Sequence, residues 1–308
     1  MNILVTGCGG DIGQSIGKLL KAEFPNWNVF GTDLHNEHAG HFIFDACYII
    51  PKAADPGYLN EVRSLVSKLS VDIVVPSTEA ELDFFVTAQV GGPHVIMPSR
   101  TAYEVGSDKL TTAEYLASAG LPHPKTVAAT SRPPFLPCIL KSRRGSGSKF
   151  VHLVKDEKTF AHLSALLSDP ICQEYLPDAN AEYTCGVFRS ARGLKRNLIV
   201  RRRLMGGFTG FGEVHSEPAI EQLLNSLSDS LALVGSINVQ LRLTEGVPMI
   251  FEINARFSST VLFRHLLGFK DVAWCIEDKI GKNLSAYSPP KDGSKFYKGF
   301  NEYVVLQN

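Results

Sequence analysis

The chain has 308 residues, of which 44% are hydrophobic and 20% charged, as in ordinary globular proteins, and its length predicts two or three packed lobes. Lys plus Arg and Asp plus Glu both number 31, and this zero net charge argues against a nucleic-acid binder. No apolar run is long enough to cross a membrane, and we expect no secretory signal. The six scattered cysteines form no C-x-x-C pair, so we expect free thiols in a cytoplasmic protein.

The first hundred residues alternate short apolar runs with segments of helical periodicity. The predicted strands are 3–6, 29–32, 71–76 and 94–97, and the predicted helices are 11–22, 58–69 and 79–88. Strands that alternate with helices in this way favour a parallel sheet with helices on its faces. We therefore expect an α/β domain over residues 1–105.

Beyond residue 105 the pattern changes from alternation to hairpins. A helix predicted over 108–119 ends at Gly120, and prolines follow it. The elements expected next are strands 137–141, 149–154, 171–176, 181–188, 194–203, 236–243 and 247–254, helices 156–168 and 217–234, and a glycine-rich loop over 204–212. Short turns at 190–193 and 245–246 connect neighbouring strands, so this part of the chain predicts antiparallel sheet, that is, an α+β lobe.

The turn after the first strand is similar to the dinucleotide fingerprint of NAD-dependent epimerases and short-chain reductases. Gly7, Gly10 and Gly13 lie between a strand and a helix, and Asp33 closes the second strand. Those enzymes also need a lysine four residues after a catalytic tyrosine. No such lysine follows the tyrosines at 103, 115, 175 and 183. A redox role stays an alternative, and glycines that only tighten the turn are the other interpretation.

Three histidines, His35, His38 and His41, are spaced by three residues in the loop after Asp33. Zinc binds clusters of this kind. Because no cysteine is nearby in the sequence and no helix fixes the spacing, we expect surface histidines here.

A lysine at a strand end precedes a glycine-serine loop. Lys141 is followed by Gly145, Ser146, Gly147 and Ser148 and then by another predicted strand. This is no Walker loop, because the G-x-x-x-x-G-K-[ST] pattern is absent and no helix follows. Backbone N–H groups of such a hairpin can cover phosphates, since glycine permits a close approach. A surface hairpin without a ligand is the alternative.

The last predicted strand ends in polar residues on one face. Glu252 and Asn254 point the same way, while Phe251 and Ile253 are expected to point into a core. A carboxylate and an amide oxygen side by side suit Mg²⁺ together with substrate phosphates. On the preceding strand Asn238 and Gln240 also share a face. A polar outer face of an antiparallel sheet is the alternative.

The segment from Glu252 to Ser259 resembles the E-x-N-P-R-x-S motif of ATP-grasp enzymes, most closely that of carbamoyl-phosphate synthetase halves. The resemblance covers most of the chain and implies roles for further residues. The nucleotide-binding residues that it implies are Lys109, Lys141, Gly145, Ser146, Gly147, Ser148, Glu174, Tyr175, Leu176 and Glu182. Glu174 would accept from the adenine amino group and Glu182 would bind ribose. The implied metal ligands are Gln240, Glu252 and Asn254, and Arg256 and Lys141 would act on the transferring phosphoryl group.

Two departures from the family pattern concern this motif and its neighbour strand. Gln240 stands where many ATP-grasp ligases have a carboxylate, which lowers the charge available to a second metal ion. Ala255 replaces the usual proline.

The resemblance also implies an architecture. It comprises a Rossmann-like pre-ATP-grasp domain (residues 1–105), a two-lobed ATP-grasp domain (106–290, with a lid near 120–175 and a catalytic lobe near 176–290) and a C-terminal tail (291–308).

The implied activity is that of a ligase using ATP and Mg²⁺, with Mn²⁺ as an alternative ion. A small carboxylate would become an acyl phosphate, which an amine or another nucleophile would attack. We expect no nucleic-acid or membrane partner and leave a homodimer open. Residues 76–79, Arg201, Arg203 and the loop 206–212 are expected at the substrate, whose identity the sequence does not give. A non-catalytic nucleotide-binding regulator is a further alternative.

Overall fold

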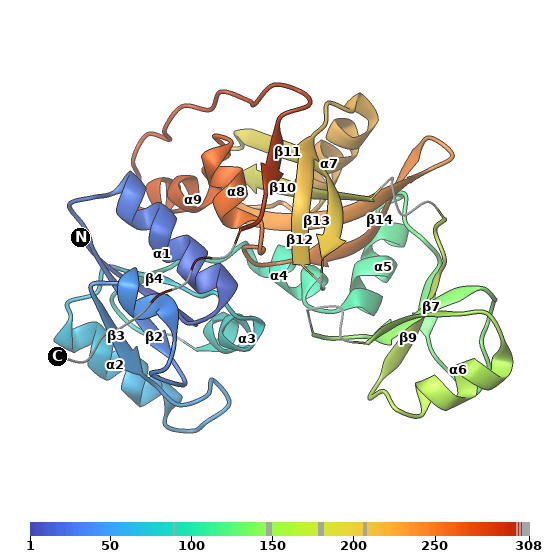
Figure 1. Cartoon of the computed structure of the whole chain (residues 1–308), viewed down its shortest axis with the longest axis horizontal. Helices are drawn as coiled ribbons and strands as arrows, with labels where there is room; N and C mark the ends of the chain where they lie inside the picture. Colours follow the sequence, from blue (N-terminus) through green and yellow to red (C-terminus); the bar gives the residue numbers. More distant parts are fainter. Residues whose placement is uncertain are drawn as a thin grey trace.

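The computed structural model describes residues 1–88, 90–145, 150–177, 182–205, 208–299, 301 and 303. Figure 1 shows an N-terminal α/β part in blue and cyan, a small green unit at the opposite end, and a larger yellow and orange part above and between them. Among the described residues no helix is long and apolar enough to span a bilayer.

The N-terminal part is a parallel sheet of five strands in the order β3-β2-β1-β4-β5. Its elements are β1 Asn2–Thr6, α1 Asp11–Glu23, β2 Asn28–Asp33, the 3-10 turn η1 Ala39–Phe42, β3 Ala46–Ile49, α2 Tyr58–Lys68, β4 Ile73–Val75, α3 Glu79–Thr87 and β5 His94–Val95. Successive residues of β1 bury opposite faces: Ile3 and Val5 pack in one core cluster with α1, and Leu4 packs in another with α2. The predicted parallel sheet is confirmed. The sequence did not predict β3, in which three residues are half-buried and Ile49 is exposed, without a clear alternation.

Two short helices, α4 Arg100–Gly106 and α5 Lys109–Ser118, connect the N-terminal part to the rest. The Asp108 carboxylate caps α5 by accepting from the backbone N–H groups of Leu110 and Thr111. Both helices contact β14, so they place the start of α5 beside the end of that strand.

The small unit is a four-stranded antiparallel sheet in the order β6-β9-β7-β8, covered by one helix. Its elements are β6 Thr126–Ala128, β7 Cys138–Ser142, β8 Val151–Val154, α6 Glu157–Ser164 and β9 Pro170–Glu174. Cys138, Leu140 and Cys172 pack with Phe160 of α6 in a core of their own.

The largest sheet has six antiparallel strands in the order β14-β13-β10-β11-β12-β15. Its strands are β10 Glu182–Arg189, β11 Lys195–Met205, β12 Phe208–Val214, β13 Gly235–Thr244, β14 Val247–Asn254 and β15 Lys295–Tyr297, and its helices are α7 Pro218–Ser230, α8 Val261–Leu266 and α9 Asp271–Lys279. One face packs on α7, and the other packs on α8, α9 and α1.

Two expectations about this sheet are wrong. The glycine-rich stretch 204–212 is not only a loop, because β12 begins within it. A Cβ on Gly212 would lie 2.3 Å from Phe296 of β15, so this glycine lets two strands approach. Phe251 does not enter the core. The register shifts between Gln240 and Leu241, and this bulge leaves Phe251 half-buried beside Lys141. Within residues 291–308, expected as a C-terminal tail, Lys295–Tyr297 form β15 and pair with β12, an observation that leaves the predicted domain limits untested.

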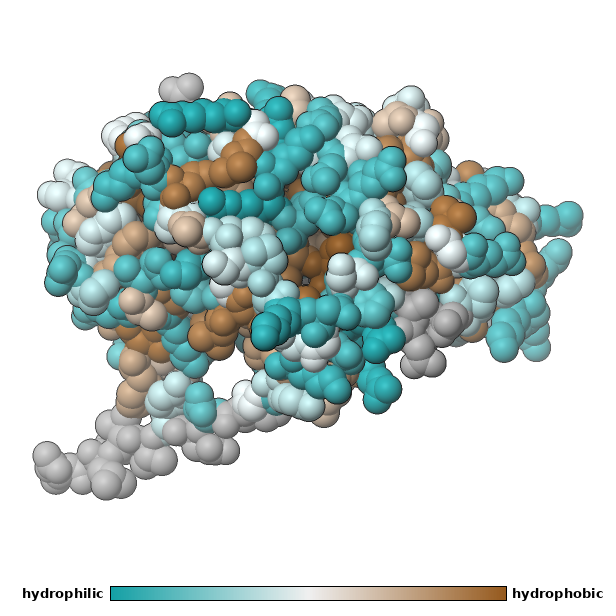
Figure 2. Space-filling model, turned by 90° about the horizontal axis from the view of Figure 1, so that it is seen from above, coloured by the Kyte–Doolittle hydropathy of each residue, from teal (hydrophilic) through white to brown (hydrophobic). Residues whose placement is uncertain are grey.

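The N-terminal part and the six-stranded sheet share one core. Ile16, Leu19 and Leu20 of α1 lie in the same cluster as Phe188 of β10 and Trp274 of α9. At the rim Lys270 Nζ donates to both carboxylate oxygens of Glu23, at 2.8 and 2.9 Å. On the face shown in Figure 2, hydrophobic residues form small patches among hydrophilic ones.

Candidate active site

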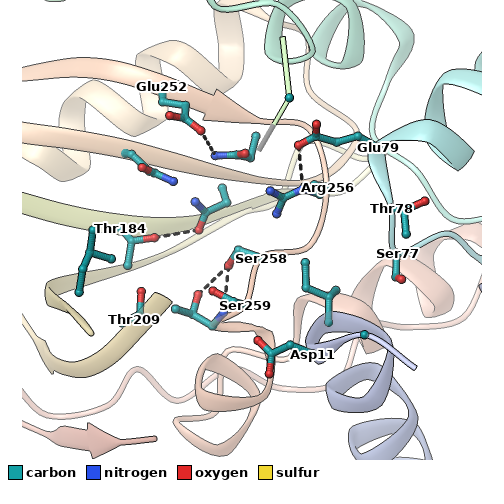
Figure 3. Close-up of a pocket in the computed structure, with 18 of the residues that line it drawn as sticks. Asp11, Ser77, Thr78, Glu79, Thr184, Thr209, Glu252, Arg256, Ser258 and Ser259 are labelled. Carbon is teal, nitrogen blue, oxygen red and sulfur yellow. Dashed lines mark hydrogen bonds and ion pairs between the residues drawn. The ribbon is translucent and has the colours of Figure 1, made fainter. Parts of the chain in front are cut away.

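A cavity of about 610 Å³ lies where the three parts of the molecule meet. The N-terminal part supplies the turn after β1 and the start of α3, the small sheet supplies the end of β7, and the large sheet supplies its polar face. Figure 3 shows polar side chains along the lining, with Glu252 and Asp11 at opposite ends of the view and Arg256 between them. Such a concave, polar-lined junction is the default location for a ligand site.

Glu252 and Asn254 lie together at the end of β14, as the strand alternation predicts. Asn254 Nδ2 donates to Glu252 Oε1 at 3.1 Å. Their partners across the ladder are Gln240 and Asn238. Four oxygen-bearing side chains therefore meet on one face of the two strands, the donor set that a hard divalent cation prefers.

Two hydrogen bonds fix the side chain of Asn238. Its Oδ1 accepts from Thr184 Oγ1 at 3.0 Å and from Arg264 Nη1 at 3.4 Å. Arg264 in turn is fully buried beside Asp271, with Nη2 2.9 Å from the carboxylate. Burial raises the pKa of Asp271, although the Arg264 charge opposes this. The Asn238 Nδ2 group is buried without a hydrogen-bond partner among the described residues, so it is a donor available to a ligand.

Lys141 is the most perturbed cation of the cavity. Its Nζ donates to Gln173 Oε1 at 2.8 Å and to the Phe251 carbonyl at 3.4 Å. Burial lowers the pKa of Lys141 to about 8, and the Glu252 charge opposes this shift. Among the described residues no carboxylate contacts this ammonium directly, and such a cation favours the approach of an anion.

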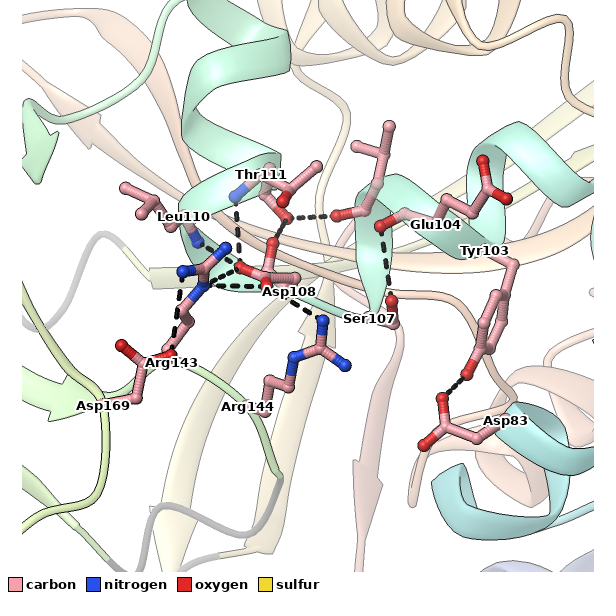
Figure 4. Close-up of polar contacts among 12 residues, drawn as sticks. Asp83, Tyr103, Glu104, Ser107, Asp108, Leu110, Thr111, Arg143, Arg144 and Asp169 are labelled. Atoms are coloured by element: carbon pink, nitrogen blue, oxygen red, sulfur yellow. Dashed lines mark hydrogen bonds and ion pairs between the residues drawn. The ribbon is translucent and has the colours of Figure 1, made fainter. Parts of the chain in front are cut away.

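Lys109 reaches the same end of the cavity from the first turn of α5. Its Nζ donates to the Gly145 carbonyl at 2.7 Å. The neighbouring Asp108, buried at 2% exposure, binds Arg143 Nε through both oxygens at 2.8 Å (Figure 4). Burial alone would raise the pKa of Asp108, but the hydrogen bond and charge of Arg143 outweigh it and lower that pKa. Asp108 therefore joins α5 to the end of β7.

Arg256 extends across the cavity toward α3. Its Nε donates to Glu79 Oε1 at 3.1 Å (Figure 3), and its Nη1 donates to the Phe257 carbonyl. The Ser258 and Thr260 hydroxyls, 2.7 Å apart, follow it along the wall. The guanidinium is thus held in place by a partner from the N-terminal part.

Glu182 is bound by two arginines. Arg202 donates to Oε1 at 2.9 and 2.7 Å, and Arg242 donates to Oε2 at 3.2 and 2.8 Å. Burial would raise the pKa of Glu182, but the two guanidinium charges hold it below its usual value. Arg202 also donates to Gln240 Oε1 at 2.8 Å and Arg242 to the Leu176 carbonyl at 2.6 Å.

The end of β9 and the residues after it place their side chains on two sides of the strand. Gln173 faces Lys141, whereas the exposed Glu174 carboxylate accepts from the Lys125 N–H at 3.1 Å. Tyr175 is half-buried and Leu176 is buried. Gln173, rather than Glu174, therefore lies beside the ammonium.

The cavity contains about half of the residues predicted for the site. Those that line it are Lys109, Lys141, Gly145, Gln240, Glu252, Asn254 and Arg256. Four others, Glu174, Tyr175, Leu176 and Glu182, do not line it, and Ser146, Gly147 and Ser148 lie outside the described residues.

The sequence reasoning missed several residues of the lining. Arg202 lines the cavity in place of the expected Arg201 and Arg203, because neighbouring residues of β11 face opposite sides. Arg201 instead pairs with Glu213 at 3.3 Å. Other lining residues that were not predicted include Asp11, Arg144 and Thr184, whereas Asn238 was expected on the same face as Gln240. The sequence did contain a signal for Arg202. Residues that lie opposite each other on paired strands share a face of the sheet, and Arg202 lies opposite the predicted site residue Glu182.

The glycine turn belongs to this cavity too. Gly7, Gly10 and Gly13 line it, and a Cβ on Gly13 would lie 2.1 Å from the Gly7 carbonyl oxygen. The glycines therefore serve close packing of α1 on the turn. The Asp33 carboxylate accepts from the Gly9 N–H at 2.8 Å.

The tyrosine–lysine spacing of a reductase does occur at Tyr48 with Lys52 and at Tyr287 with Lys291. Tyr48 lies in β3 and Tyr287 outside any helix, so neither pair shares a helix face. Neither tyrosine lines the cavity. Burial raises the pKa of Tyr287 to about 12, the direction opposite to that needed for proton transfer.

Comparison with known proteins agrees with this geometry. The family described as ATP-grasp domain matches residues 106–260, just over half of the chain, and the PylC-like N-terminal domain family matches residues 3–90. Comparison with curated protein sequences gives no match.

Solved structures share the fold over nearly the whole chain. N5-carboxyaminoimidazole ribonucleotide synthetase from Thermus thermophilus superposes with a TM-score of 0.73 at 17% identity, covering 94% of this chain and 81% of its own. L-amino acid ligase from Bacillus licheniformis gives 0.69 at 16%, covering 90% and 74%. The biotin carboxylase domain of Hydrogenobacter thermophilus 2-oxoglutarate carboxylase, in complex with MgADP, ADP and bicarbonate, gives 0.68 at 15%, covering 92% and 71%.

The family match, the pre-ATP-grasp sheet and the cavity between three parts all agree, and no observation supports the reductase alternative. The chain belongs to the ATP-grasp family, enzymes that use ATP and a divalent metal ion to activate carboxylates.

Proposed function

We propose that the protein uses Mg·ATP to convert a small carboxylate into an acyl phosphate, which an amine then attacks to form an amide. The observation that carries the proposal is that Lys109, Lys141, Glu252 and Asn254 all line one cavity. Phosphoryl transfer needs positioning and charge neutralisation more than a protein nucleophile. The lining supplies cations and oxygen donors in that arrangement.

Glu252 and Asn254 would hold the divalent ion. Their oxygens share one face of β14, and Glu252 keeps one carboxylate oxygen free of the bond to Asn254. Gln240 is the weaker candidate ligand, because its oxygen accepts from Arg202. When bound, Mg²⁺ would neutralise phosphate charge, and an all-oxygen set that includes one carboxylate suits it, with Mn²⁺ as an alternative.

The lysines and the segment after β9 would bind the nucleotide. Lys109 and Lys141 lie at the same end of the cavity, and Gly145 begins the glycine-serine stretch proposed to cover the phosphates. Glu174, Tyr175 and Leu176 remain the residues proposed to contact the adenine ring. Gln173 of β9 is the side chain that contacts Lys141. Glu182 would reach ribose only by releasing hydrogen bonds to Arg202 or Arg242.

Arg256 would stabilise the phosphoryl group in transfer. Glu79 holds its Nε and leaves Nη2 as a donor toward the cavity, where Asn238 Nδ2 is a further donor. The carboxylate and the amine would bind near the glycine turn, where Asp11, Ser77 and Thr78 line the wall. Asp11 Oδ1 already accepts from Lys298 Nζ at 2.6 Å, so this carboxylate would offer its second oxygen to a protonated amine.

Calorimetric titration of the full chain tests the proposal. We expect ATP to bind in the presence of Mg²⁺, to bind more weakly after chelation of the ion, and NADPH not to bind. A screen of carboxylate and amine pairs for phosphate release would then identify the substrates. Tight NADPH binding without ATP binding would contradict the proposal.

A further inference from the structure

Two cysteines and a histidine that are far apart in the sequence meet beside the glycine turn. Cys8 follows β1, Cys47 lies in β3, and His38 lies in the loop between β2 and η1. Cys8 Sγ is 3.9 Å from Cys47 Sγ and 3.8 Å from His38 Nε2. All three ligand atoms lie within 4.8 Å of one another. The sequence-based expectation of surface histidines, made because no cysteine was nearby, is wrong for His38.

Glycines lie around this cluster at positions where a larger residue would clash with Cys8 or His38. Strand β2 lies between the two cysteines, and a Cβ on its Gly31 would come 2.7 Å from Cys8 Sγ. A Cβ on Gly9 would come 2.9 Å from the His38 ring, and one on Gly40 would come 2.8 Å from His38 Nδ1. Three glycines therefore open the space in which the three side chains converge.

Two of the three distances between these atoms match the edges of a tetrahedral metal site, and the third is within 4.8 Å. Bond lengths of Zn²⁺ to sulfur and nitrogen imply edges of about 3.8 Å between two sulfurs and about 3.6 Å between sulfur and nitrogen. The observed 3.9 and 3.8 Å are close to both edges.

Neighbouring groups hold the loop that carries His38, whereas its second ring nitrogen does not have, among the described residues, the acceptor that a metal-bound histidine uses. His38 Nδ1 is buried and finds no hydrogen-bond partner in the part of the chain that the structure describes. The His38 ring stacks on His41, whose Nε2 lies 2.7 Å from the Asn36 carbonyl and so fixes the loop. Thiolate and imidazole together select zinc-like cations over Mg²⁺.

We propose that Cys8, Cys47 and Nε2 of His38 form a binding site for a thiophilic divalent cation of the Zn²⁺ class, with water in the fourth position. The site is separate from the Glu252 and Asn254 pair, which offers oxygen donors only. Because Gly7, Gly10 and Asp11 next to Cys8 line the main cavity, the ion would fix the turn that bounds it.

Co²⁺ titration of the metal-stripped full chain under reducing conditions tests the site. Wild type is expected to bind one Co²⁺ with a sulfur-to-cobalt charge-transfer band and tetrahedral visible bands, all removed by added Zn²⁺. In Cys47→Ser the charge-transfer band falls to about half. In His38→Ala the band remains but affinity falls at least about tenfold.

Matched controls separate ligands from neighbours. Cys172→Ser removes a buried thiol of the small sheet, and His41→Ala removes the stacked histidine; both are expected to keep wild-type Co²⁺ spectra and affinity. Circular dichroism confirms that each variant is folded. Absence of the charge-transfer band in wild type, or a band of full intensity in Cys47→Ser, would overturn the proposal. So would a Cys8–Cys47 disulfide in a protein whose reduced form binds no Co²⁺.

Discussion

Glu252 is the residue on which the metal assignment depends most directly. Glu252→Gln keeps size and strand geometry but removes the charge that would hold Mg²⁺ against the phosphates. We expect turnover to fall at least about a hundredfold, as when a main electrostatic term is removed. The melting temperature without nucleotide should change little, and the stabilisation by Mg·ATP should shrink because it follows affinity.

Glu221→Gln is the matched control for this substitution. Glu221 is exposed on α7 and does not line the cavity. The control should keep full activity and the full Mg·ATP-induced shift in a thermal melt. If Glu252→Gln behaved like the control, Glu252 would be a solvated strand residue and the metal assignment would be wrong.

Lys141 predicts a pH dependence of nucleotide binding. Burial lowers its pKa to about 8, so above that pH the free protein must take up a proton when phosphates bind. The Kd for Mg·ATP should therefore rise by up to about tenfold per pH unit above about 8. Lys141→Arg should flatten this profile, because arginine stays protonated. Titrations across this range measure it, and an unchanged slope in Lys141→Arg would remove Lys141 from the phosphate site.

The Lys141 pKa affects the pH dependence of folding stability in the direction opposite to its effect on ATP binding. The pKa of an unfolded lysine is about 10.4, so the unfolded state binds more protons between that value and about 8. Over this window the Lys141 contribution makes stability rise with pH. Weaker ATP binding in this pH range therefore cannot be caused by a loss of folding stability that comes from Lys141.

At the scale of elements, Asp108 connects the small sheet to the rest. Asp108→Asn keeps an N-cap for α5 but removes the charge that binds Arg143. We expect faster hydrogen exchange in β7 and β8 and a loss of about 1.5–3 kcal/mol of stability, typical for a buried hydrogen bond to a charged group.

Mg·ATP should slow exchange in β7 and β8 of wild type, since Phe150 and Val151 are exposed at the cavity and available to cover a ligand.

Asp156→Asn provides the comparison, because Asp156 caps α6 and pairs with no arginine that the structure describes. Exchange in β7 should stay as in wild type. The pKa of Asp108 is lowered in the folded protein, so its contribution is present above about pH 4 and is lost as pH falls through the folded value. Wild type and Asp108→Asn should converge in acid. If hydrogen exchange in β7 and β8 at neutral pH were the same in Asp108→Asn as in Asp156→Asn, Asp108 would not be the residue that connects the small sheet to α5.

The sequence predicted the elements whose patterns are local. The parallel strands and the polar ends of β14 could be predicted because alternation decides which side chains share a face. Strand β12 could not be recognised, since its glycines serve close contacts with Phe296 and Met205 that exist only after folding. The Cys8 cluster could not be recognised either, because the sheet order, and not sequence spacing, brings Cys47 of β3 to Cys8 across Gly31 of β2.

The site was predicted by family resemblance more than by pattern. Lys109, Lys141, Glu252 and Arg256 meet in the cavity as expected, whereas the partners of Glu182 were not foreseen. Hydrogen bonds between distant side chains, such as Arg256 with Glu79 across 177 residues, have no sequence signature. The finer resemblance to carbamoyl-phosphate synthetase halves and the domain limits stay predictions.

At the scale of the whole molecule, the shared core predicts that the N-terminal part and the large sheet unfold together. Residues of α1 pack in one cluster with β10 and α9, and Glu23 binds Lys270 across the junction. A cluster that crosses the boundary couples the stability of both sides, because neither can open without exposing the other.

The two tryptophans of the chain allow a direct test, since they lie on opposite sides of this junction. Trp27 stacks on Phe24 after α1, and Trp274 is fully buried in α9. In Trp27→Phe the fluorescence reports the large-sheet side, and in Trp274→Phe it reports the N-terminal side. In each variant we expect the fluorescence melt to coincide with the melt followed by circular dichroism, and Mg·ATP to shift both together. Trp274→Phe should melt lower, because it leaves space in the core and the Ser285 hydroxyl loses its donor. If Trp27 reported a separate, earlier transition, the N-terminal part would be an independent folding unit.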